Sequence, residues 1–171
     1  PPLMVRLYHT LRGSFEEVLL VTNNPLRYLS WDLTIVTDLF PIRSSLAGIH
    51  AGLFYASAPH AFITACDMPF LKTELIRALL AELDPKWDVI MPVTGKGNEP
   101  LCAIYSKRCI KPIECQLKNE DPKIANFFPK VRVKEIPEAR LRSADPHLIS
   151  FFNINTPKDL AGSEKMLREQ G

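Results

Sequence analysis

Three apolar runs near the start of the chain each stop abruptly at a polar side chain. The runs end at Asn23, Asp38 and Asp67. A short apolar run with such a stop is typical of a strand buried inside a parallel sheet. Segments with helical spacing lie between several of the runs, and strands that alternate with helices form parallel sheets joined by right-handed crossovers. We therefore predict an α/β domain with a mostly parallel sheet.

The same patterns give an expected order of helices and strands. Helices are expected at residues 3–12, 45–58, 71–83 and 107–117. Strands are expected at residues 17–24, 33–38, 61–66, 87–92, 101–105, 131–135 and 148–155. The alternation at 131–135 is that of an edge strand. A last helix should begin near Thr156, because Thr156 suits an N-cap, Pro157 the first helical position and Asp159 the first turn.

The composition limits the kinds of partner. The chain has 171 residues, which suits a single domain with one core. Its formal net charge is +2 and no dense basic block alternates with aromatic residues, so nucleic acid is not an expected partner. Basic residues are in excess between Lys107 and Arg142, where we expect solvated faces, with an anionic ligand or an acidic partner protein as the alternative. No apolar run reaches the roughly 20 residues of a membrane span, so no membrane partner is expected.

The spacing of the cysteines indicates the redox state of the compartment in which the protein occurs. The chain has four of them, Cys66, Cys102, Cys109 and Cys115. They lack the close pairs of a zinc ribbon or a redox motif, so we expect buried thiols in a reducing compartment. No charged and then apolar signal peptide opens the sequence. These features predict a cytoplasmic protein.

Asp67 is the polar stop with the clearest chemistry. It is followed by Met68 and Pro69, and the predicted strand would place its carboxylate at the carboxyl end of the sheet. Open α/β sheets bind ligands at that edge, and a carboxylate there can hold Mg²⁺ against the phosphates of a nucleotide. The alternative is that Asp67 only caps the helix that follows.

Five short motifs occur in the order and spacing of one enzyme family. They are Thr37-Asp38, Ser45-Leu-Ala-Gly48, Cys66-Asp-Met-Pro69, Asn98-Glu-Pro-Leu101 and Asn153-Ile-Asn-Thr-Pro157. With these motifs, nearly the whole chain resembles the molybdenum cofactor guanylyltransferases, also called molybdopterin-guanine dinucleotide biosynthesis protein A. A strand followed by Asp-x-Pro is shared by many nucleotidyltransferases, whereas Ser-Leu-Ala-Gly combined with Asn-Ile-Asn-Thr-Pro is more specific. The resemblance implies a three-layer, Rossmann-like nucleotidyltransferase fold in a single domain over residues 1–171.

The resemblance also implies an activity, which is transfer of GMP from GTP to the terminal phosphate of molybdopterin that carries molybdenum, with release of pyrophosphate. GTP and the molybdenum cofactor are then the ligands, Mg²⁺ is the cofactor, and maturation proteins of molybdoenzymes are potential partners. The nucleophile would be a phosphate monoester with a second pKa of about 6, so it is largely a dianion at neutral pH and needs no general base. Charge neutralisation by Mg²⁺ and cationic side chains should dominate instead.

Five residues match positions with a role in the family or lie next to one. Asp67 matches the catalytic, Mg²⁺-binding aspartate at the nucleotide site, and Asp38 matches an acidic residue at the guanine-nucleotide site. Asn23 lies just beyond a position where some members have a nucleotide-contacting asparagine. Asn153 and Asn155 match paired asparagines on the pterin side, and alternate residues of a regular strand could turn both amides into one cleft. The alternative is that Asn155 helps to cap the last helix and Asn153 bonds a loop backbone.

One family feature is missing from these residues. Members open with a glycine-rich signature, Leu-Ala-Gly-Gly followed by Ser, Arg-Met-Gly and a Lys, whose amides and cationic side chains hold the triphosphate. Because the start at Pro2 matches the stretch just beyond that signature, we expect an N-terminally incomplete domain that is inactive as a transferase. A cytidylyltransferase for the same cofactor, another small-molecule nucleotidyltransferase and a non-catalytic relative that binds and delivers the cofactor are the alternatives.

Two further places depart from a simple match. Ser44 and Ser45 stand where the family often has Gly-Pro. Gly95-Lys-Gly97 lacks the full P-loop pattern and predicts a mobile turn between two strands, from which Lys96 could approach a ligand at the rim of the cleft.

Overall fold

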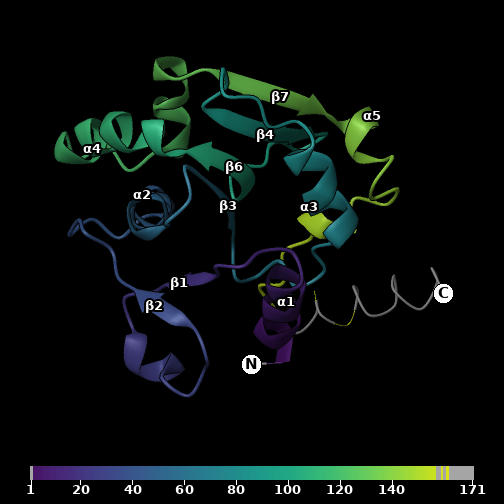
Figure 1. The fold of residues 1–171 in the computed structure, drawn as a ribbon, viewed down its shortest axis with the longest axis horizontal. Coiled ribbons are helices and arrows are strands. Elements are labelled where there is room, and N and C mark those ends of the chain that lie inside the picture. The colour runs from purple at the N-terminus through teal and green to yellow at the C-terminus, as the bar shows by residue number, and fades with distance from the viewer. Residues whose placement is uncertain (1, 157–158, 160, 162–171) are drawn as a thin grey trace.

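The computed structural model describes residues 2–156, 159 and 161 (Figure 1). Its α-helices are α1 (Pro2–Arg12), α2 (Ser45–Tyr55), α3 (Thr73–Leu80), α4 (Ile110–Lys118) and α5 (Glu138–Leu141). Its strands are β1 (Leu19–Val21), β2 (Thr34–Val36), β3 (His60–Thr64), β4 (Val89–Thr94), β5 (Gly97–Asn98), β6 (Cys102–Ser106) and β7 (Val133–Pro137). The 3₁₀ helices are η1 (Pro25–Tyr28), η2 (Lys107–Cys109), η3 (Ile124–Asn126), η4 (Phe128–Lys130) and η5 (Ile149–Phe151). The first four predicted helices are therefore present, although α2 and α3 are shorter than predicted.

The strands form two sheets, and most of the pairing is antiparallel. β1 and β2 pair in parallel, with Leu20 opposite Ile35. In the five-stranded sheet β6 runs antiparallel to both β3 and β4, and β7 pairs in parallel with β4 at an edge, as predicted for an edge strand. The predicted α/β class is confirmed, but the pairing is mixed instead of mostly parallel, since three of the five strand pairings among the described residues are antiparallel. A tight turn and the short strand β5 connect β4 to β6, and such a connection suits antiparallel strands, whereas parallel neighbours need a crossover of about a dozen residues.

Helices cover both faces of the five-stranded sheet (Figure 1). On one face, Leu75 of α3 belongs to a buried cluster that includes Ile90 of β4. On the other face, Leu53 of α2 and Ile113 of α4 belong to a second cluster that includes Met91 of β4. Successive residues of β4 thus enter opposite clusters, as expected for a strand buried on both faces. The result is a three-layer arrangement with a mixed sheet.

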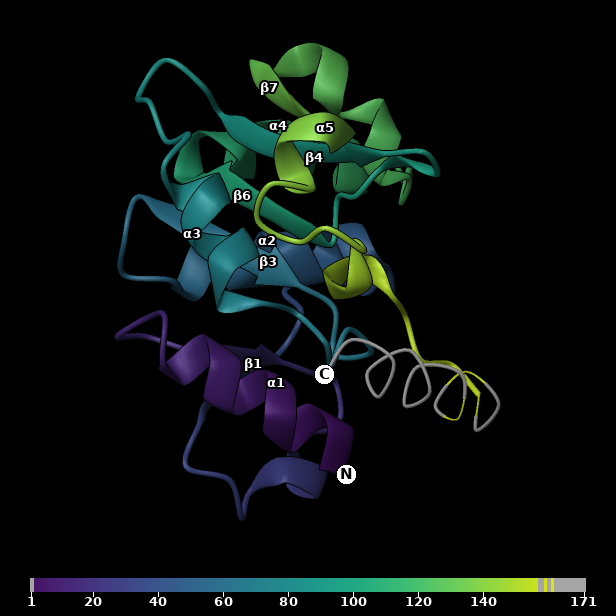
Figure 2. The same ribbon diagram turned by 90° about the vertical axis from the view of Figure 1, so that its right-hand side faces the viewer.

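A cavity of about 900 Å³ lies where the two sheets adjoin. β1, β3 and α2 line it together with Leu11 of α1, and Figure 2 shows α1 alongside β1. Gly52 of α2 packs closely against both strands, because an added Cβ would lie 3.2 Å from Ile63 Cδ1 and 3.8 Å from Val21 Cγ2. Among the described residues β1 pairs only with β2, and β3 only with β6, so each has one unpaired backbone edge. The sheet divides at this cavity.

The predicted strand at 148–155 is wrong. Leu148 adopts the left-handed conformation with φ of 53°, and the next three residues form η5. The buried carboxylate of Asp145 accepts a 2.8 Å hydrogen bond from the Ser150 N–H, and its other oxygen lies 3.1 Å from Lys72 Nζ. These tertiary contacts hold the turn and outweigh the apolar strand pattern.

A helix start at Thr156 is supported by reciprocal hydrogen bonds. Asp159 Oδ2 accepts from Thr156 N over 2.8 Å, and Thr156 Oγ1 accepts from Asp159 N over 3.2 Å. This pairing is the capping box of a helix N-terminus. The predicted role of Pro157 lies outside the described residues.

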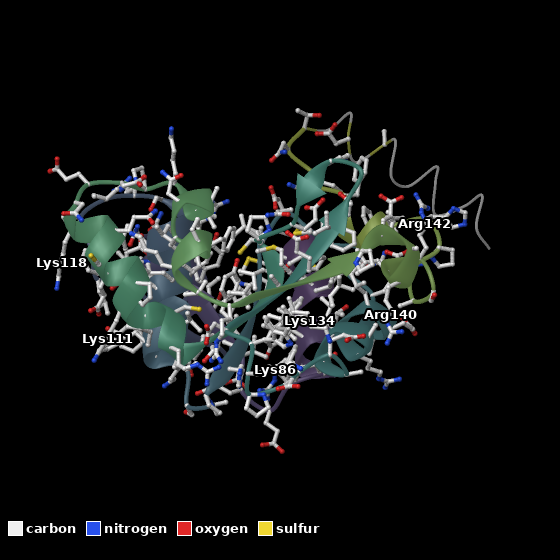
Figure 3. The ribbon with its side chains drawn as sticks, turned by 90° about the horizontal axis from the view of Figure 1, so that it is seen from above. Lys86, Lys111, Lys118, Lys134, Arg140 and Arg142 are labelled. Atoms are coloured by element: carbon white, nitrogen blue, oxygen red, sulfur yellow. The ribbon has the colours of Figure 1, made fainter. Side chains whose placement is uncertain are left out.

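The basic residues in the second half of the chain do not form one surface. Figure 3 shows Lys111 and Lys118 on α4, far from Lys134 and Arg140. Lys134 and Arg140 both bind Glu82, over 2.6 and 2.7 Å. These contacts favour the solvated faces over a dedicated anion site.

Two other expectations concern the cysteines and the membrane. Cys102 and Cys109 are buried, as expected. Cys66 and Cys115 are exposed, so the prediction of a buried thiol is wrong for these two. Within the described residues, no helix is long and apolar enough to cross a membrane.

Candidate functional site

Asn23 and Asp38 lie together at the ends of two neighbouring strands. Because β1 and β2 are parallel, the residues that follow them meet at the same edge of the sheet. Asn23 Nδ2 donates a 2.8 Å hydrogen bond to Asp38 Oδ2, and Asp38 N donates to Asn23 Oδ1 over 3.3 Å. Both residues line the large cavity. The structure therefore brings two of the three predicted nucleotide-binding residues, Asn23 and Asp38, into one polar pair.

The N-terminus of α2 opens on the same cavity. Ser44 is the N-cap, and its hydroxyl accepts a 3.1 Å hydrogen bond from Ala47 N. Ser45 and Gly48 line the cavity, and a Cβ added at Gly48 would meet nothing within 4 Å. A helix N-terminus offers unpaired N–H groups and favours negative charge, so this end of α2 suits a phosphate. The sequence motifs assigned Ser44 no role, although a serine before a helical pattern is an N-cap signal.

Asp67 lies in the turn after β3, where the apolar run ends. Its Oδ1 atom is buried and has no hydrogen-bond partner among the described residues. Burying a carboxylate oxygen is costly unless a donor or a cation satisfies it. The helix-cap alternative fails, because α3 begins at Thr73 and its N-cap residue is Lys72. The orphaned oxygen instead fits a bound cation.

A cation at Asp67 would take few ligands from the protein. In the part of the chain that the structure describes, no three His, Cys, Asp or Glu side chains are grouped to hold a metal. Mg²⁺ commonly binds through one or two carboxylates and completes its shell with waters and substrate phosphates. A single aspartate with an unsatisfied oxygen is compatible with that mode of Mg²⁺ binding.

The backbone of Asp67 is bonded to the segment that carries Asn153 and Asn155. Ile154 N donates a 2.8 Å hydrogen bond to the Asp67 carbonyl oxygen. Asn153 and Asn155 flank this bond, have exposed side chains and line a second cavity of about 350 Å³. The two amides thus share a cavity, but an irregular segment places them there instead of the strand that the sequence predicts.

Polar side chains from the turn between β4 and β5 line one side of the second cavity. The turn between β4 and β5 and the residues after it contribute Lys96, Asn98 and Glu99. Burial raises the pKa of Glu99, while the Thr94 hydroxyl and the Lys96 ammonium act in the opposite direction. Sequence reasoning places Asn98 and Glu99 in a motif and assigns them no role. A carboxylate two residues after a glycine turn was the available signal.

The predicted residues therefore divide between two cavities. Asn23 and Asp38 belong to the large one, and Asn153 and Asn155 to the small one. Asp67 itself lines neither cavity, although its neighbour Cys66 lines the large one and its carbonyl oxygen accepts a hydrogen bond from Ile154, which lies between the two asparagines of the small one. Asp67 therefore connects, through its backbone, the segments that border the two cavities.

The family model described as the MobA-like NTP transferase domain matches residues 1–132. The chain belongs to this family. The resemblance inferred from the five motifs is thereby confirmed.

Curated MobA-like relatives match most of the chain. The molybdenum cofactor guanylyltransferase of Desulfosudis oleivorans is 43% identical over 163 residues, which cover 95% of this chain and 81% of that protein. A probable molybdenum cofactor guanylyltransferase of Natranaerobius thermophilus is 40% identical, with 90% and 77% of the two chains covered.

Solved structures show the same fold. Molybdopterin-guanine dinucleotide biosynthesis protein A from Archaeoglobus fulgidus superposes with a TM-score of 0.85 at 29% identity, covering 98% of this chain and 86% of that one. The 2-C-methyl-D-erythritol 4-phosphate cytidylyltransferase from Thermus thermophilus has a TM-score of 0.67 at 15% identity, covering 97% and 89%. The second likeness is one of fold alone, and it is consistent with a Rossmann-like nucleotidyltransferase architecture.

Proposed function

We propose that the protein transfers GMP from GTP to the terminal phosphate of molybdopterin that carries molybdenum, and releases pyrophosphate. The observation that carries the proposal is the 2.8 Å hydrogen bond from Ile154 N to the carbonyl of Asp67, whose own carboxylate has an orphaned oxygen. A transferase that joins two phosphorylated substrates needs both binding sites beside one charge-neutralising group. The names of the relatives in Desulfosudis and Archaeoglobus support these two substrates.

GTP would occupy the large cavity. Asn23 and Asp38 offer an amide and a carboxylate to the guanosine part, and the start of α2 at Ser45 and Gly48 offers backbone N–H groups to the phosphates. Asp67 would hold Mg²⁺, which when bound neutralises phosphate charge in the transition state.

The acceptor would occupy the small cavity. Asn153 and Asn155 would bind the pterin, leaving its terminal phosphate directed toward Asp67. An oxygen of that phosphate attacks the α-phosphorus of GTP, a new P–O bond forms, and the bond to the β-phosphate bridging oxygen breaks as pyrophosphate leaves. The dianionic nucleophile needs no base, so the protein's own contribution is alignment of the two phosphates. The same assignment implies a cytoplasmic enzyme that serves molybdoenzymes and their maturation proteins.

Product formation tests the proposal. A chain that carries the glycine-rich signature is incubated with Mg²⁺, molybdenum-loaded molybdopterin and either GTP or CTP. We expect the guanine dinucleotide and pyrophosphate with GTP alone. A product from CTP would instead make the protein a cytidylyltransferase, and molybdopterin binding without any product would make it a cofactor carrier.

Asp67→Asn tests the metal-binding role. The variant should lose on the order of several kcal/mol of transition-state stabilisation, measured as pyrophosphate release at limiting Mg²⁺. Asp32→Asn is the matched control, because Asp32 is exposed and, among the described residues, only its backbone oxygen accepts a hydrogen bond, from the Tyr8 hydroxyl. Near wild-type turnover by Asp67→Asn would contradict the assignment.

Replacing both Asn153 and Asn155 by Ala tests the acceptor side. Molybdopterin binding should weaken by roughly 1–3 kcal/mol for each ligand group left unpaired, while GTP affinity stays almost unchanged. Calorimetry that shows equal loss of both ligands, with a lower melting temperature, would instead assign the two residues a purely structural role.

A further inference from the structure

Glu99 is hydrogen-bonded through its backbone and its side chain at the wall of the small cavity. Its backbone N donates to Pro92 O over 2.9 Å, and its carbonyl accepts from Cys102 N over 3.1 Å, so the main chain is fixed on both sides. The Thr94 hydroxyl donates a 2.8 Å hydrogen bond to Glu99 Oε1. No described residue donates a hydrogen bond to Oε2. The side chain is half-buried, oriented on one oxygen and available on the other.

The hydrogen-bonding groups that line this cavity limit which ligand can pair with Glu99. The described lining residues include the amides of Asn98, Asn153 and Asn155 and the ammonium of Lys96. Amides can donate or accept, and an ammonium only donates. The second carboxylate, that of Asp159, accepts from the backbone N–H groups at 155 and 156. Glu99 therefore supplies the acceptor that calls for a ligand with two adjacent N–H donors.

We propose that Glu99 binds the 2-amino-4-oxopyrimidine edge of the pterin and so determines which heterocycle the acceptor site takes. This inference rests on the proposed function. The 2-amino group and N3–H of a pterin lie side by side and match the two oxygens of one carboxylate, in the manner of a bidentate charge-assisted pair. Oε1 keeps a free lone pair beside its bond from Thr94, so both oxygens can accept.

Guanine carries the same pair of donors, so the position of Glu99 decides between the two ligands. Glu99 lines the cavity of Asn153 and Asn155, whereas Asn23 and Asp38 line the other one. The carboxylate therefore faces the acceptor and leaves the nucleotide base to the large cavity.

A pair of fluorescent ligands tests the assignment on the 171-residue protein without any turnover. The probes are a pterin and the lumazine with the same 6-substituent, in which a 2-oxo group replaces the 2-amino donor. At neutral pH the wild type should bind the pterin about tenfold more tightly or better, because the lumazine oxygen would face a carboxylate. Glu99→Gln keeps an acceptor for Thr94 and should lose most of this preference. Glu135→Gln, at an exposed position of β7, is the matched control and should retain it.

Two further measurements separate the possible failures. Glu99→Asp keeps the negative charge but moves the carboxylate one methylene farther from the ligand. It should therefore weaken pterin binding and keep the preference for pterin over lumazine. Equal binding of pterin and lumazine by the wild type, or a loss of guanosine over xanthosine preference in Glu99→Gln, would overturn the inference while the proposed function stands. A wild type that binds no pterin would also overturn it, whereas the proposed function is tested separately by product formation in the chain that carries the glycine-rich signature.

Discussion

The five-stranded sheet and the β1–β2 pair are packed very differently. β4 and β6 bury side chains on both faces, and Met91 and Ile104 expose only 0% and 1% of their surface. β1 and β2 are three residues long, and each contributes one buried side chain, Leu20 or Val36. Stability within a protein follows such differences, because regions with few buried apolar contacts open more easily.

The difference coincides with the division of the candidate site. Asn23 and Asp38 stand on the lightly packed pair, and the η1 helix between its strands leaves Leu26 exposed by 78%. The small cavity is lined partly by the turn between β4 and β5, which pairs with β4 at Val93 and Thr94. The residues proposed to bind the nucleotide therefore lie in the region with fewer buried apolar side chains, which is the region expected to open more easily.

Truncating one buried side chain in the five-stranded sheet and one in the β1–β2 pair should give the largest difference in stability between these two regions. Ile104→Ala should lower the free energy of unfolding by about 2–5 kcal/mol, because it leaves a cavity in the dense sheet. Leu20→Ala should cost less globally and chiefly speed hydrogen exchange of the β1 and β2 amides. Urea denaturation and native-state exchange measure the two effects, and an equal loss in both variants would break the comparison.

Protonation of the buried Asp145 carboxylate should lower the stability of the densely packed region around the five-stranded sheet. Burial alone would raise the pKa of Asp145, but hydrogen bonds from Ser150 and the Lys72 ammonium outweigh it and lower that pKa. Because the folded pKa lies below the unfolded value of about 4, this carboxylate stabilises the fold at neutral pH and ceases to do so as the pH falls through the folded pKa. Asp145→Asn should therefore flatten the dependence of the urea midpoint on pH below about 5. An unchanged acid profile would remove Asp145 from this role.

Gly97→Ala should disturb the turn that supports the acceptor cavity. Gly97 has φ of +107°, a conformation that side chains rarely adopt. We expect a loss of about 1 kcal/mol or more in thermal unfolding, with weaker pterin binding. Gly13→Ala, at the end of α1 where φ is not positive, is a control for glycine replacement in general.

Gly48→Ala should have the smallest effect and the opposite sign. A Cβ there meets nothing within 4 Å, so the variant should gain up to about 1 kcal/mol from helix propensity. Thermal unfolding measures this effect. Gly48 lines the large cavity, so a destabilised variant would mean that this cavity has no room for the added methyl group.

Local patterns predicted much of the fold and the position of Asp67. The apolar run of β3 and the helical spacing of α2 are local signals, and both elements formed. The direction of β6 could not be predicted, because an apolar run looks the same whether its neighbours are parallel or antiparallel. The C-terminal strand failed for a different reason, since the Asp145 carboxylate that bends residues 148–151 acts through contacts with α3's N-cap Lys72.

Parts of the candidate site could not be predicted from the sequence either, because they depend on contacts between residues that are distant in sequence. Asn23 and Asp38 were each visible as polar stops, but their mutual hydrogen bonds depend on β1 and β2 being neighbours. Glu99 was visible only as part of a motif. Its chemistry emerges when the β4–β5 turn is set against residues 151–155, which are distant in sequence.

The hydrogen bond from Ile154 N to Asp67 O has a thermodynamic consequence. The peptide that accepts it carries the carboxylate assigned to the nucleotide side, and the residue that donates it lies between the two asparagines assigned to the acceptor. Any ligand that shifts one end of this bond changes the free energy of the other end. Linkage requires the effect to be reciprocal, so the factor by which GTP alters the affinity for the pterin equals the factor by which the pterin alters the affinity for GTP.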